Sequence, residues 1–490
     1  MSRNQNLYHI LSQRFPADGE QPFIIDQLSY AELEASSARM ANYLLSLDLN
    51  SGDRVAVQVN KSAQVLVVYL ACLRAGLIYL PLNTAYTQAE LAYFFQDAGP
   101  GLIVADQASV KTLAQQQGAR FETMAGLLAH SATAPAQFAT VHSSADDLAA
   151  ILYTSGTTGR PKGAMLSHSN LAANALMLHD YWGWDQQDVL LHALPIFHVH
   201  GLFVACHCVL AAGASMIFLP SFKVEQVIEQ LPRATVMMGV PTFYTRLLAS
   251  EDFSAQPCHA MRLFISGSAP LLASTHQLFE QRTGHKILER YGMSETSMLI
   301  SNPLHGERRA GTVGFALPGV DARIVDTNNK AVSEGVIGSI QVKGPNVFQG
   351  YWQMLEKTAE EFTDDGFFIT GDQGLISEDG YISIVGRAKD MVISGGYNVY
   401  PKEVELVIDA IEGVKESAVF GVADADFGEA VSVAVVLDHT VALSPEQIAA
   451  EARETLAAYK VPKLVHFLDE LPRNTMGKVQ KNVLRQQFAS

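Results

Sequence analysis

The stretch TSGTTGRPKG (Thr154–Gly163) is the most informative part of the sequence, and it follows directly on the apolar run LAAILY. The apolar run predicts a buried strand, and the Thr, Ser and Gly residues after it predict a loop rich in hydroxyls and exposed backbone N–H groups. Together with the ammonium of Lys162, such a loop can hold the oxygens of a polyphosphate. The alternative is a flexible surface turn, although the loop is long for one.

Six further motifs follow this loop along the chain. They are PIFHVHG (Pro195–Gly201), ISGSAPL (Ile265–Leu271), YGMSE (Tyr291–Glu295), ITGD (Ile369–Asp372), GRAKDMVISGGYNVYP (Gly386–Pro401) and PRNTMGKVQK (Pro472–Lys481). In this order the motifs resemble those of the acyl-adenylating superfamily, which includes acyl-CoA synthetases, peptide-synthetase adenylation domains and beetle luciferases. The loop is not an ordinary P-loop, because Lys162 is followed by Gly163 instead of Ser or Thr.

The composition indicates a large chain with extensive buried cores and an acidic balance of charge. The 490 residues are 48% hydrophobic and 17% charged, with a formal net charge of −16. This charge argues against nucleic acid and against anionic membranes as partners. Four cysteines do not suggest a disulfide framework in so long a chain, and the polar start MSRNQNLYHILSQRF does not resemble a signal peptide. We therefore expect a reducing, cytoplasmic location.

The stretch from Val189 to Phe222 contains no Asp, Glu, Lys or Arg and is long enough to cross a bilayer. Pro195, Gly201 and Gly213 interrupt it, so we predict instead a strand, a turn, a buried helix and a second strand. Its HVH and CHC tripeptides suggest zinc, but the spacing of the two cysteines is too short. Buried thiols that pack as small hydrophobic groups are the favoured interpretation.

Apolar runs alternate with helical patterns through the first two-thirds of the chain. Val65–Gly76 predicts a helix that ends at a glycine, and ATVMMGVPTFYTRLL predicts a strand, a turn at Pro241 and a helix. This alternation predicts an α/β fold of parallel sheets covered by helices. After Gly311, short alternating strands predict a small barrel-like β subdomain. The resemblance implies a large N-terminal domain at residues 1–386 and a smaller, mobile α+β C-terminal domain at residues 387–490.

The resemblance also implies the residues of an ATP site. Thr154, Glu295 and Lys478 match catalytic positions, Glu295 as the Mg²⁺ ligand and Lys478 as the lysine of the adenylation step. The positions that match ATP-binding residues are Ser155, Gly156, Thr157, Thr158, Gly159, Lys162, Ser266, Gly267, Ser268, Tyr291, Gly292, Met293, Ser294, Asp372 and Arg387. Taken alone, Glu295 could be a solvated residue at a helix start, Asp372 a turn former and Lys478 a solubilising charge.

Two half-reactions in one site are implied as well. The first joins a carboxylate to the α-phosphate of ATP and releases pyrophosphate, and the second transfers the acyl group to the thiol of coenzyme A. Lys389 matches the hinge about which the C-terminal domain is expected to rotate between them, because hinge residues absorb the dihedral change. Gly395 and Gly396 match the lining of the coenzyme A thiol tunnel.

Two arginines indicate the acid substrate. Arg290 precedes YGMSE at a position that is usually small or neutral in fatty-acyl and aryl relatives, and Arg246 lies in a segment that lines their acyl pocket. His198 and His200 add polar groups. A buried guanidinium is costly unless it meets an anion, and a carboxylate fits its fork. We therefore expect a short dicarboxylate, malonate or methylmalonate, in line with a resemblance to malonyl-CoA synthetases. Alternatively, Arg290 pairs with a carboxylate of the protein.

Several functions stay open on the sequence alone. The chain could be another short-chain or aryl acyl-CoA ligase with a structural Arg290, or an enzyme that passes the acyl group to a carrier protein. A non-catalytic nucleotide-binding relative is the alternative of a different class, although Lys478, Glu295 and Asp372 are all retained. The expected partners are a dicarboxylate, ATP, Mg²⁺ and coenzyme A, and the sequence does not distinguish a monomer from a dimer.

Overall fold

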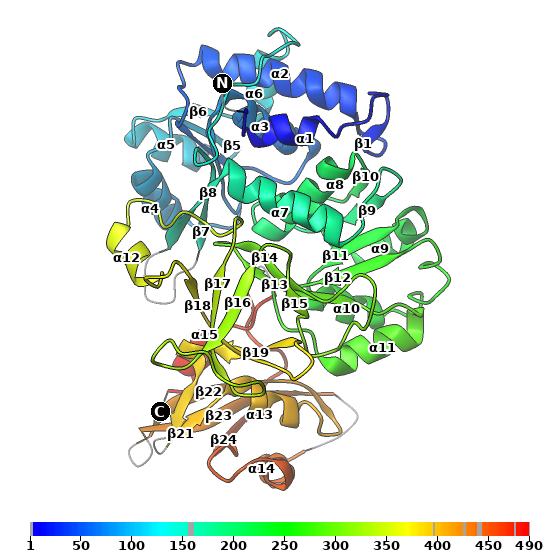
Figure 1. The fold of residues 1–490 in the computed structure, drawn as a ribbon, viewed down its shortest axis with the longest axis vertical. Coiled ribbons are helices and arrows are strands. Elements are labelled where there is room, and N and C mark those ends of the chain that lie inside the picture. The colour runs from blue at the N-terminus through cyan, green and yellow to red at the C-terminus, as the bar shows by residue number, and fades with distance from the viewer. Residues whose placement is uncertain are drawn as a thin grey trace. The chain divides into compact units, whose positions relative to one another are not determined.

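The structure is a computed structural model that describes residues 3–154, 161–394, 397–424, 428–438, 443–474 and 477–489. The chain divides into two compact units (Figure 1). The first unit consists of Met1–Asp321 and Lys343–Phe368, and the second of Ala322–Val342 and Ile369–Ser490. The prediction that a mobile C-terminal domain begins after residue 386 is a separate matter and stays a prediction.

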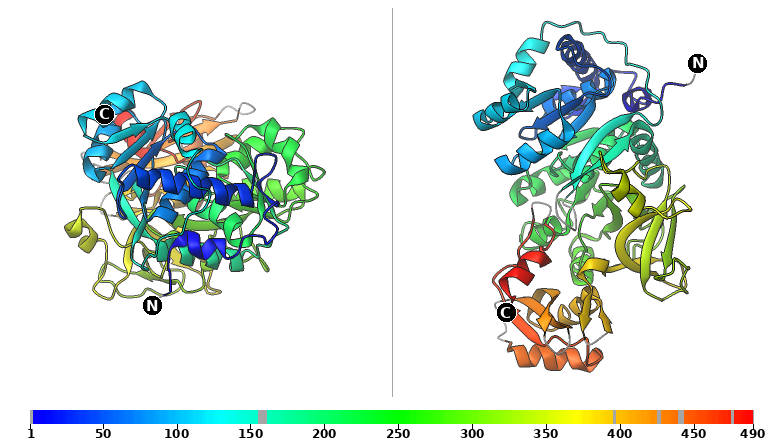
Figure 2. Two further views of the ribbon diagram at one scale, coloured as in Figure 1. Left: turned by 90° about the horizontal axis from the view of Figure 1, so that it is seen from above. Right: turned by 90° about the vertical axis from the view of Figure 1, so that its left-hand side faces the viewer.

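One sheet of the first unit contains six strands among the described residues, in the order β6-β5-β3-β4-β7-β8. Its strands are β3 (Arg54–Gln58), β4 (Ile78–Pro81), β5 (Leu102–Ala105), β6 (Arg120–Glu122), β7 (Leu148–Thr154) and β8 (Lys162–Ser167). Within the described part of this sheet, β7 and β8 pair antiparallel and the other neighbouring strands pair parallel. Helices lie on both faces of this sheet (Figure 2). They are α2 (Tyr30–Ser46), α3 (Ala63–Ala75), α4 (Gln88–Ala98), α5 (Ala108–Gln116) and α6 (Met124–Ser131).

Local sequence explains where these helices begin and end. Ser29 and Glu32 form a capping box at the start of α2, so two backbone N–H groups that lack partners inside the helix are satisfied. Helix α3 ends at Gly76, whose φ of 70° is left-handed and is adopted by glycine at little cost. The prediction of a helix ending at this glycine is therefore confirmed.

The other sheet of the first unit contains nine strands among the described residues, in the order β15-β14-β13-β12-β11-β9-β10-β1-β2. They are β1 (Pro22–Ile24), β2 (Leu28–Ser29), β9 (Val189–His192), β10 (Ser215–Phe218), β11 (Val236–Gly239), β12 (Leu263–Ser266), β13 (Leu288–Met293), β14 (Ser297–Ser301) and β15 (Phe315–Ala316). The helices around it are α1 (Leu7–Ser12), α7 (His168–Tyr181), α8 (His207–Ala212), α9 (Val224–Gln230), α10 (Pro241–Leu248) and α11 (Ala273–Thr283), with a 3₁₀ turn η2 (Leu231–Arg233). Parallel pairing runs from β1 through β10, β9, β11 and β12 to β13.

The uncharged stretch folds as predicted. It forms β9, the π-helix η1 (His200–Cys206), α8 and β10, and every residue from His200 to Phe218 is buried. No helix within the described ranges is long and apolar enough to cross a membrane. Cys206 and Cys208 are buried in this stretch, as the interpretation of the cysteines as core residues predicts.

The second unit contains nearly all of two smaller sheets. One has the order β16-β17-β18-β19, with β16 (Asp321–Val325), β17 (Gly338–Lys343), β18 (Phe368–Ile376) and β19 (Ile382–Arg387). The other comprises β20 (Val392–Ser394), β21 (Tyr397–Val399), β22 (Val414–Asp424), β23 (Gly428–Leu437) and β24 (Leu464–Phe467). The turn η3 (Ala388–Asp390) and the helices α13 (Pro401–Ile408), α14 (Pro445–Thr455) and α15 (Lys481–Gln487) accompany them. The small β subdomain predicted after Gly311 corresponds to the four-stranded sheet β16-β17-β18-β19.

Four buried histidines should make the stability of the protein depend on pH. Burial lowers the pKa of His168 to about 4 and that of His207 to about 3, and it lowers the pKa of His192 and of His200 well below the usual value. Each ring stays neutral in the folded chain, whereas in the unfolded chain it takes up a proton once the pH falls through about 6.5. Acid therefore favours the unfolded chain.

We expect the free energy of unfolding to fall between pH 7.5 and pH 5 by about 2 kcal/mol for each of His168 and His207, and to fall further because of His192 and His200. Denaturant unfolding at both pH values measures the fall. The control is His207→Gln, whose amide can replace the ring nitrogen that lies 2.8 Å from the Tyr69 hydroxyl. It should lose about 2 kcal/mol less than the unmodified protein over this range. An equal loss in both proteins would contradict the assignment.

Candidate active site

Strands β7 and β8 hold the two ends of the glycine-rich loop. β7 ends at Thr154 and β8 starts at Lys162, and these two residues pair across the antiparallel ladder. The Thr154 hydroxyl lies 3.4 Å from the backbone oxygen of Lys162. The predicted phosphate-binding residues Ser155, Gly156, Thr157, Thr158 and Gly159 lie outside the described residues. The pairing of β7 with β8 thus places Thr154 and Lys162 side by side.

The side chain of Lys162 packs against a segment far along the chain. Its ammonium lies 4.1 Å from the centre of the Tyr351 ring and 3.2 Å from Oε1 of Glu361, which follows helix α12 (Leu355–Glu360). Only 11% of the lysine side chain is exposed, so both contacts act in a partly desolvated setting. The charge of Lys162 is therefore held at a defined place before any anion arrives.

Glu295 lies in the tight turn between β13 and β14 and is only 6% exposed. The Tyr351 hydroxyl donates a hydrogen bond of 3.1 Å to its Oε1, and the Phe348 N–H donates one of 2.7 Å to its backbone oxygen. The alternative of a solvated residue at a helix start is therefore wrong, because the turn belongs to a β-hairpin and buries the side chain. A carboxylate oxygen is the kind of ligand that Mg²⁺ prefers, so Glu295 fits the predicted metal-binding role.

The hairpin itself requires a glycine. A Cβ added at Gly292 would lie 1.9 Å from the backbone oxygen of Ser297, so no larger residue fits without moving the strand. Tyr291, Gly292 and Met293 lie on β13, Ser294 lies in the turn, and all four are half-buried. The predicted ATP-binding residues of this motif thus share one rigid hairpin with Glu295.

The loop after β12 meets the π-helix. Ser266 ends the strand, and Ser268 has a left-handed φ of 72°. The Ser268 hydroxyl lies 3.3 Å from Nδ1 of His200, the first residue of η1. Burial lowers the pKa of His200 well below the usual value, and the nearby charge of Arg290 lowers it further. The imidazole is therefore a neutral group beside a positive one.

Arg290 is buried on β13 without a counter-ion among the described residues. It is 4% exposed, its Nε and Nη2 have no hydrogen-bond partner there, and burial lowers its pKa to about 9. Its guanidinium lies against Gly267, where an added Cβ would come within 2.3 Å of Cζ. The alternative in which Arg290 pairs with a protein carboxylate has no support in the part of the chain that the structure describes. The geometry leaves donors for an anion.

The other two predicted substrate residues lie in different settings. His198 is half-buried, and its ring centre is 4.5 Å from that of Phe197. Arg246 is exposed in the last turn of α10, with its guanidinium 5.0 Å from the centre of the Phe222 ring. The structure thus does not bury Arg246 as it buries Arg290, and a role of Arg246 in substrate binding stays a prediction.

Six more predicted site residues belong to the second unit. Asp372 on β18 is buried, and its Oδ1 lies 2.7 Å from Nε of Arg387, its partner on β19. Lys389 is exposed in η3, and Lys478 is exposed in a loop where its N–H donates a 3.0 Å hydrogen bond to Oδ1 of Asn474. Gly395 and Gly396 lie outside the described residues. The sequence predicted both Asp372 and Arg387 as ATP-binding residues. In the structure they lie opposite each other on the paired strands β18 and β19.

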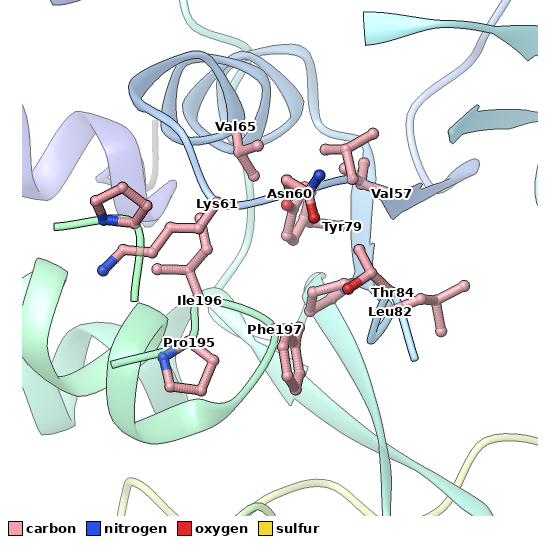
Figure 3. A pocket seen from close by; sticks show the side chains of 13 residues that line it. Val57, Asn60, Lys61, Val65, Tyr79, Leu82, Thr84, Pro195, Ile196 and Phe197 are labelled. Carbon is pink, nitrogen blue, oxygen red and sulfur yellow. The ribbon is translucent and has the colours of Figure 1, made fainter. Parts of the chain in front are cut away.

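Sequence reasoning missed Tyr351, Glu361 and Lys61. The first two lie in GYWQMLEKTAEEF, where an aromatic pair inside a polar segment was the available signal. Lys61 looks like a loop lysine, but its ammonium is 2.8 Å from Nδ1 of His192, and burial lowers its pKa well below the usual value. It lines a cavity of about 150 Å³ that Pro195, Ile196 and Phe197 also border (Figure 3). None of the predicted site residues lines this cavity.

Comparison with known proteins identifies the family. Residues 13–352 match the AMP-binding enzyme family, and residues 403–478 match the AMP-binding enzyme C-terminal domain. The chain belongs to the AMP-binding enzyme family. A malonate–CoA ligase of Arabidopsis thaliana is 34% identical over 93% of this chain and 84% of its own length. A long-chain-fatty-acid–CoA ligase of Bacillus subtilis is 33% identical over 98% and 94%.

A solved structure extends the comparison to the fold. The ATP-bound structure of MatB from Rhodopseudomonas palustris is 55% identical, covers 99% of both chains and has a TM-score of 0.97. The predicted α/β architecture with a smaller C-terminal domain is therefore confirmed. In this AMP-binding enzyme, the described part of the first unit carries two separate clusters. Lys162, Tyr351 and Glu295 form one, and His200, Ser268, Gly267 and Arg290 form the other.

The contact between Gly267 and Arg290 can be tested by a double-mutant cycle. Gly267→Ala should destabilise the protein by about 1–3 kcal/mol, because the added methyl group overlaps the guanidinium. In the double variant with Arg290→Ala that methyl group has room, so most of this cost should disappear. Denaturant unfolding of the four proteins measures the coupling energy. Additive effects would show that the guanidinium does not rest on Gly267.

Proposed function

We propose that this protein is an ATP-dependent malonate–CoA ligase. It would convert malonate, ATP and coenzyme A into malonyl-CoA, AMP and pyrophosphate through a malonyl adenylate. The observation that carries the substrate assignment is Arg290, a buried guanidinium with two nitrogen groups unpaired within the described residues. The similarity to MatB and to the malonate–CoA ligase of Arabidopsis thaliana supports the same assignment.

The environment of Arg290 favours a second carboxylate on the substrate. Burial of a guanidinium without a partner is costly, and an anion that brings two carboxylate oxygens removes the cost by forming paired hydrogen bonds. A monocarboxylic acid would leave the guanidinium unpaired after the reacting carboxylate has bound elsewhere. Gly267 and the neutral His200 leave the positive charge accessible to such a group without supplying a competing negative charge. Whether methylmalonate is also a substrate depends on whether the acyl pocket has room for its methyl group.

The first half-reaction joins two anions and therefore needs local positive charge. A substrate carboxylate oxygen attacks the α-phosphorus, a phosphoric–carboxylic anhydride forms, and pyrophosphate leaves with the bonding electrons. Lys162 supplies a cation for the leaving phosphates, and Thr154 lies beside it at the start of the loop. Glu295 would hold Mg²⁺, which when bound neutralises charge on the phosphate oxygens. Because the net charge is −16, only such local cations can attract the substrates.

The remaining proposed roles fall to Asp372, Arg387 and Lys478, which belong to the second unit. Asp372 has the carboxylate for the ribose hydroxyls, and Arg387 beside it is a cation for ribose or phosphate. Lys478 would stabilise the charge that develops between the carboxylate and the α-phosphate. In the second half-reaction the thiolate of coenzyme A attacks the acyl carbon, and AMP leaves. A rotation at Lys389 would exchange Lys478 for the thiol channel at Gly395 and Gly396.

The cellular setting and the assembly state are separate questions. All four cysteines are buried and reduced, as expected for a protein of the cytoplasm, which is the location we propose. Monomer and dimer are both compatible with the fold. Transfer of the acyl group to a carrier-protein thiol, or a preference for another short-chain or aryl acid, would be recognised by product analysis with free coenzyme A and a panel of acids.

Arg290 should determine the preference for a dicarboxylate. We expect acetate and butyrate to be poorer substrates than malonate, by a factor on the order of 10⁴ in kcat/KM, because they leave the guanidinium unpaired. Arg290→Ala should lose most of its activity on malonate and little of its weak activity on acetate. Malonate-dependent ATP–pyrophosphate exchange, compared with exchange on monocarboxylates, measures both effects. Equal use of acetate and malonate by the unmodified protein would refute the assignment.

Lys478 should act in only one half-reaction. We expect Lys478→Ala to lose pyrophosphate exchange by at least about 10²-fold, because an interaction made in the transition state is removed. The variant should still convert chemically prepared malonyl adenylate and coenzyme A into malonyl-CoA. Lys415→Ala, which removes an exposed lysine elsewhere in the second unit, is the matched control and should retain both half-reactions. Near-normal exchange by the Lys478 variant would exclude this role.

A further inference from the structure

We propose that Tyr351 is a positioning residue that holds Lys162 and Glu295 as one unit, so that the phosphate chain of ATP and its metal ion are received together. This inference rests on the proposed function, because it assigns Lys162 to the phosphates and Glu295 to Mg²⁺. The three residues are far apart in sequence. What joins them is one short segment, Phe348–Trp352.

The backbone of this segment is bonded to both partners. The Phe348 N–H donates a 2.7 Å hydrogen bond to the backbone oxygen of Glu295. On its other side the segment pairs antiparallel with β8, since the Trp352 N–H donates a 2.7 Å hydrogen bond to the Gly163 oxygen and Tyr351 pairs with Ala164. Five consecutive residues therefore connect the turn that carries Glu295 to the strand that begins with Lys162.

The segment is itself fixed in place. Gly350 has a φ of 133°, which is unfavourable for residues with a side chain, and an added Cβ would come within 2.5 Å of Thr358. The Thr358 hydroxyl accepts a 2.9 Å hydrogen bond from the Tyr351 N–H. The Trp352 indole donates a 3.1 Å bond to the Asp97 oxygen. Tyr351 thus has little freedom to move as a whole.

The side chain of Tyr351, like the backbone of its segment, links Glu295 with Lys162. Its hydroxyl donates to Oε1 of Glu295 at 3.1 Å, while its ring lies 4.1 Å from the Lys162 ammonium. Tyr351 is 2% exposed, so neither contact is weakened by competing water. A hydrogen bond to a metal-binding carboxylate orients it, and an aromatic face attracts a cation. One ring therefore sets the spacing between a cation and an anion.

Glu361 completes the arrangement by balancing the charge of Lys162. Its carboxylate lies 3.2 Å from the Lys162 ammonium and 3.1 Å from that of Lys357. With a second lysine already on Glu361, Lys162 can turn its charge toward an incoming phosphate without leaving Glu361 unpaired. The direction in which it turns is limited by the tyrosine ring. Positions that are fixed in advance lower the entropy lost when the nucleotide binds.

The test separates the hydroxyl of Tyr351 from its ring. Calorimetry measures ATP binding to the full-length protein with Mg²⁺ and, in parallel, with a chelator that removes divalent cations. We expect Tyr351→Phe to bind metal-free ATP within about twofold of normal and to lose about tenfold of the gain in affinity that Mg²⁺ provides. Tyr351→Leu should lose the same gain and should also bind metal-free ATP about threefold more weakly, since the ring no longer faces Lys162.

Tyr43→Phe is the matched control. Tyr43 donates a 2.9 Å hydrogen bond to Oε1 of Glu122, so the variant loses a tyrosine–carboxylate bond of the same kind outside the site. It should bind ATP normally under both conditions. An unchanged gain from Mg²⁺ in Tyr351→Phe, or an equal loss with and without Mg²⁺, would overturn the inference. Thermal unfolding identifies a variant that does not fold, and Tyr351→Phe alone then decides.

The same experiment distinguishes this inference from the proposed function. Pyrophosphate exchange by the unmodified protein in the presence of malonate tests the substrate assignment and does not depend on Tyr351 variants. Nucleotide binding tests the coupling between Lys162 and Glu295 and needs no acid at all. If exchange requires another acid while Tyr351→Phe loses the gain from Mg²⁺, the substrate assignment is wrong and the role of Tyr351 stands.

Discussion

A buried positive charge that the described chain does not neutralise is the main constraint on this structure. Arg290 lies on β13, and the residues around it accommodate the guanidinium without pairing it: Gly267 gives it room and His200 stays neutral. Burial lowers the pKa of Arg290 only to about 9, so it keeps its charge near neutral pH. Desolvation of an unpaired cation is unfavourable, and a fold that retains one is completed by an anion.

The cluster of Lys162, Tyr351 and Glu295 differs from the surroundings of Arg290, because its charged groups already have partners within the protein. Lys162 has Glu361, and Glu295 has the hydroxyl of Tyr351. These residues come from three distant parts of the chain, and the segment Phe348–Trp352 brings them together by backbone hydrogen bonds to β8 and to the turn after β13. The rigid part of the site is therefore a product of strand pairing, which is less sensitive to side-chain motion than a loop would be.

Local patterns predicted what depends on local physics. The helix that ends at Gly76, the strand that ends at Thr154 and the buried elements of the uncharged stretch all follow from periodicity, capping and turn residues. The environment of a side chain depends on partners far along the chain, so the burial of Glu295 and the exposure of Arg246 could not be predicted. Tyr351 was missed for the same reason, since an aromatic residue in a loop has no periodic signal.

With the roles proposed for Lys162 and Arg290, the two clusters would differ in how strongly they discriminate between ligands. A paired cation such as Lys162 exchanges one anionic partner for another, so the net gain on binding is modest and any polyphosphate of suitable shape can be held. An unpaired buried cation gains far more from the correct anion, and it gains nothing from a ligand that lacks one. We therefore assign the proposed selectivity toward the acid to Arg290, the buried charge without a partner among the described residues.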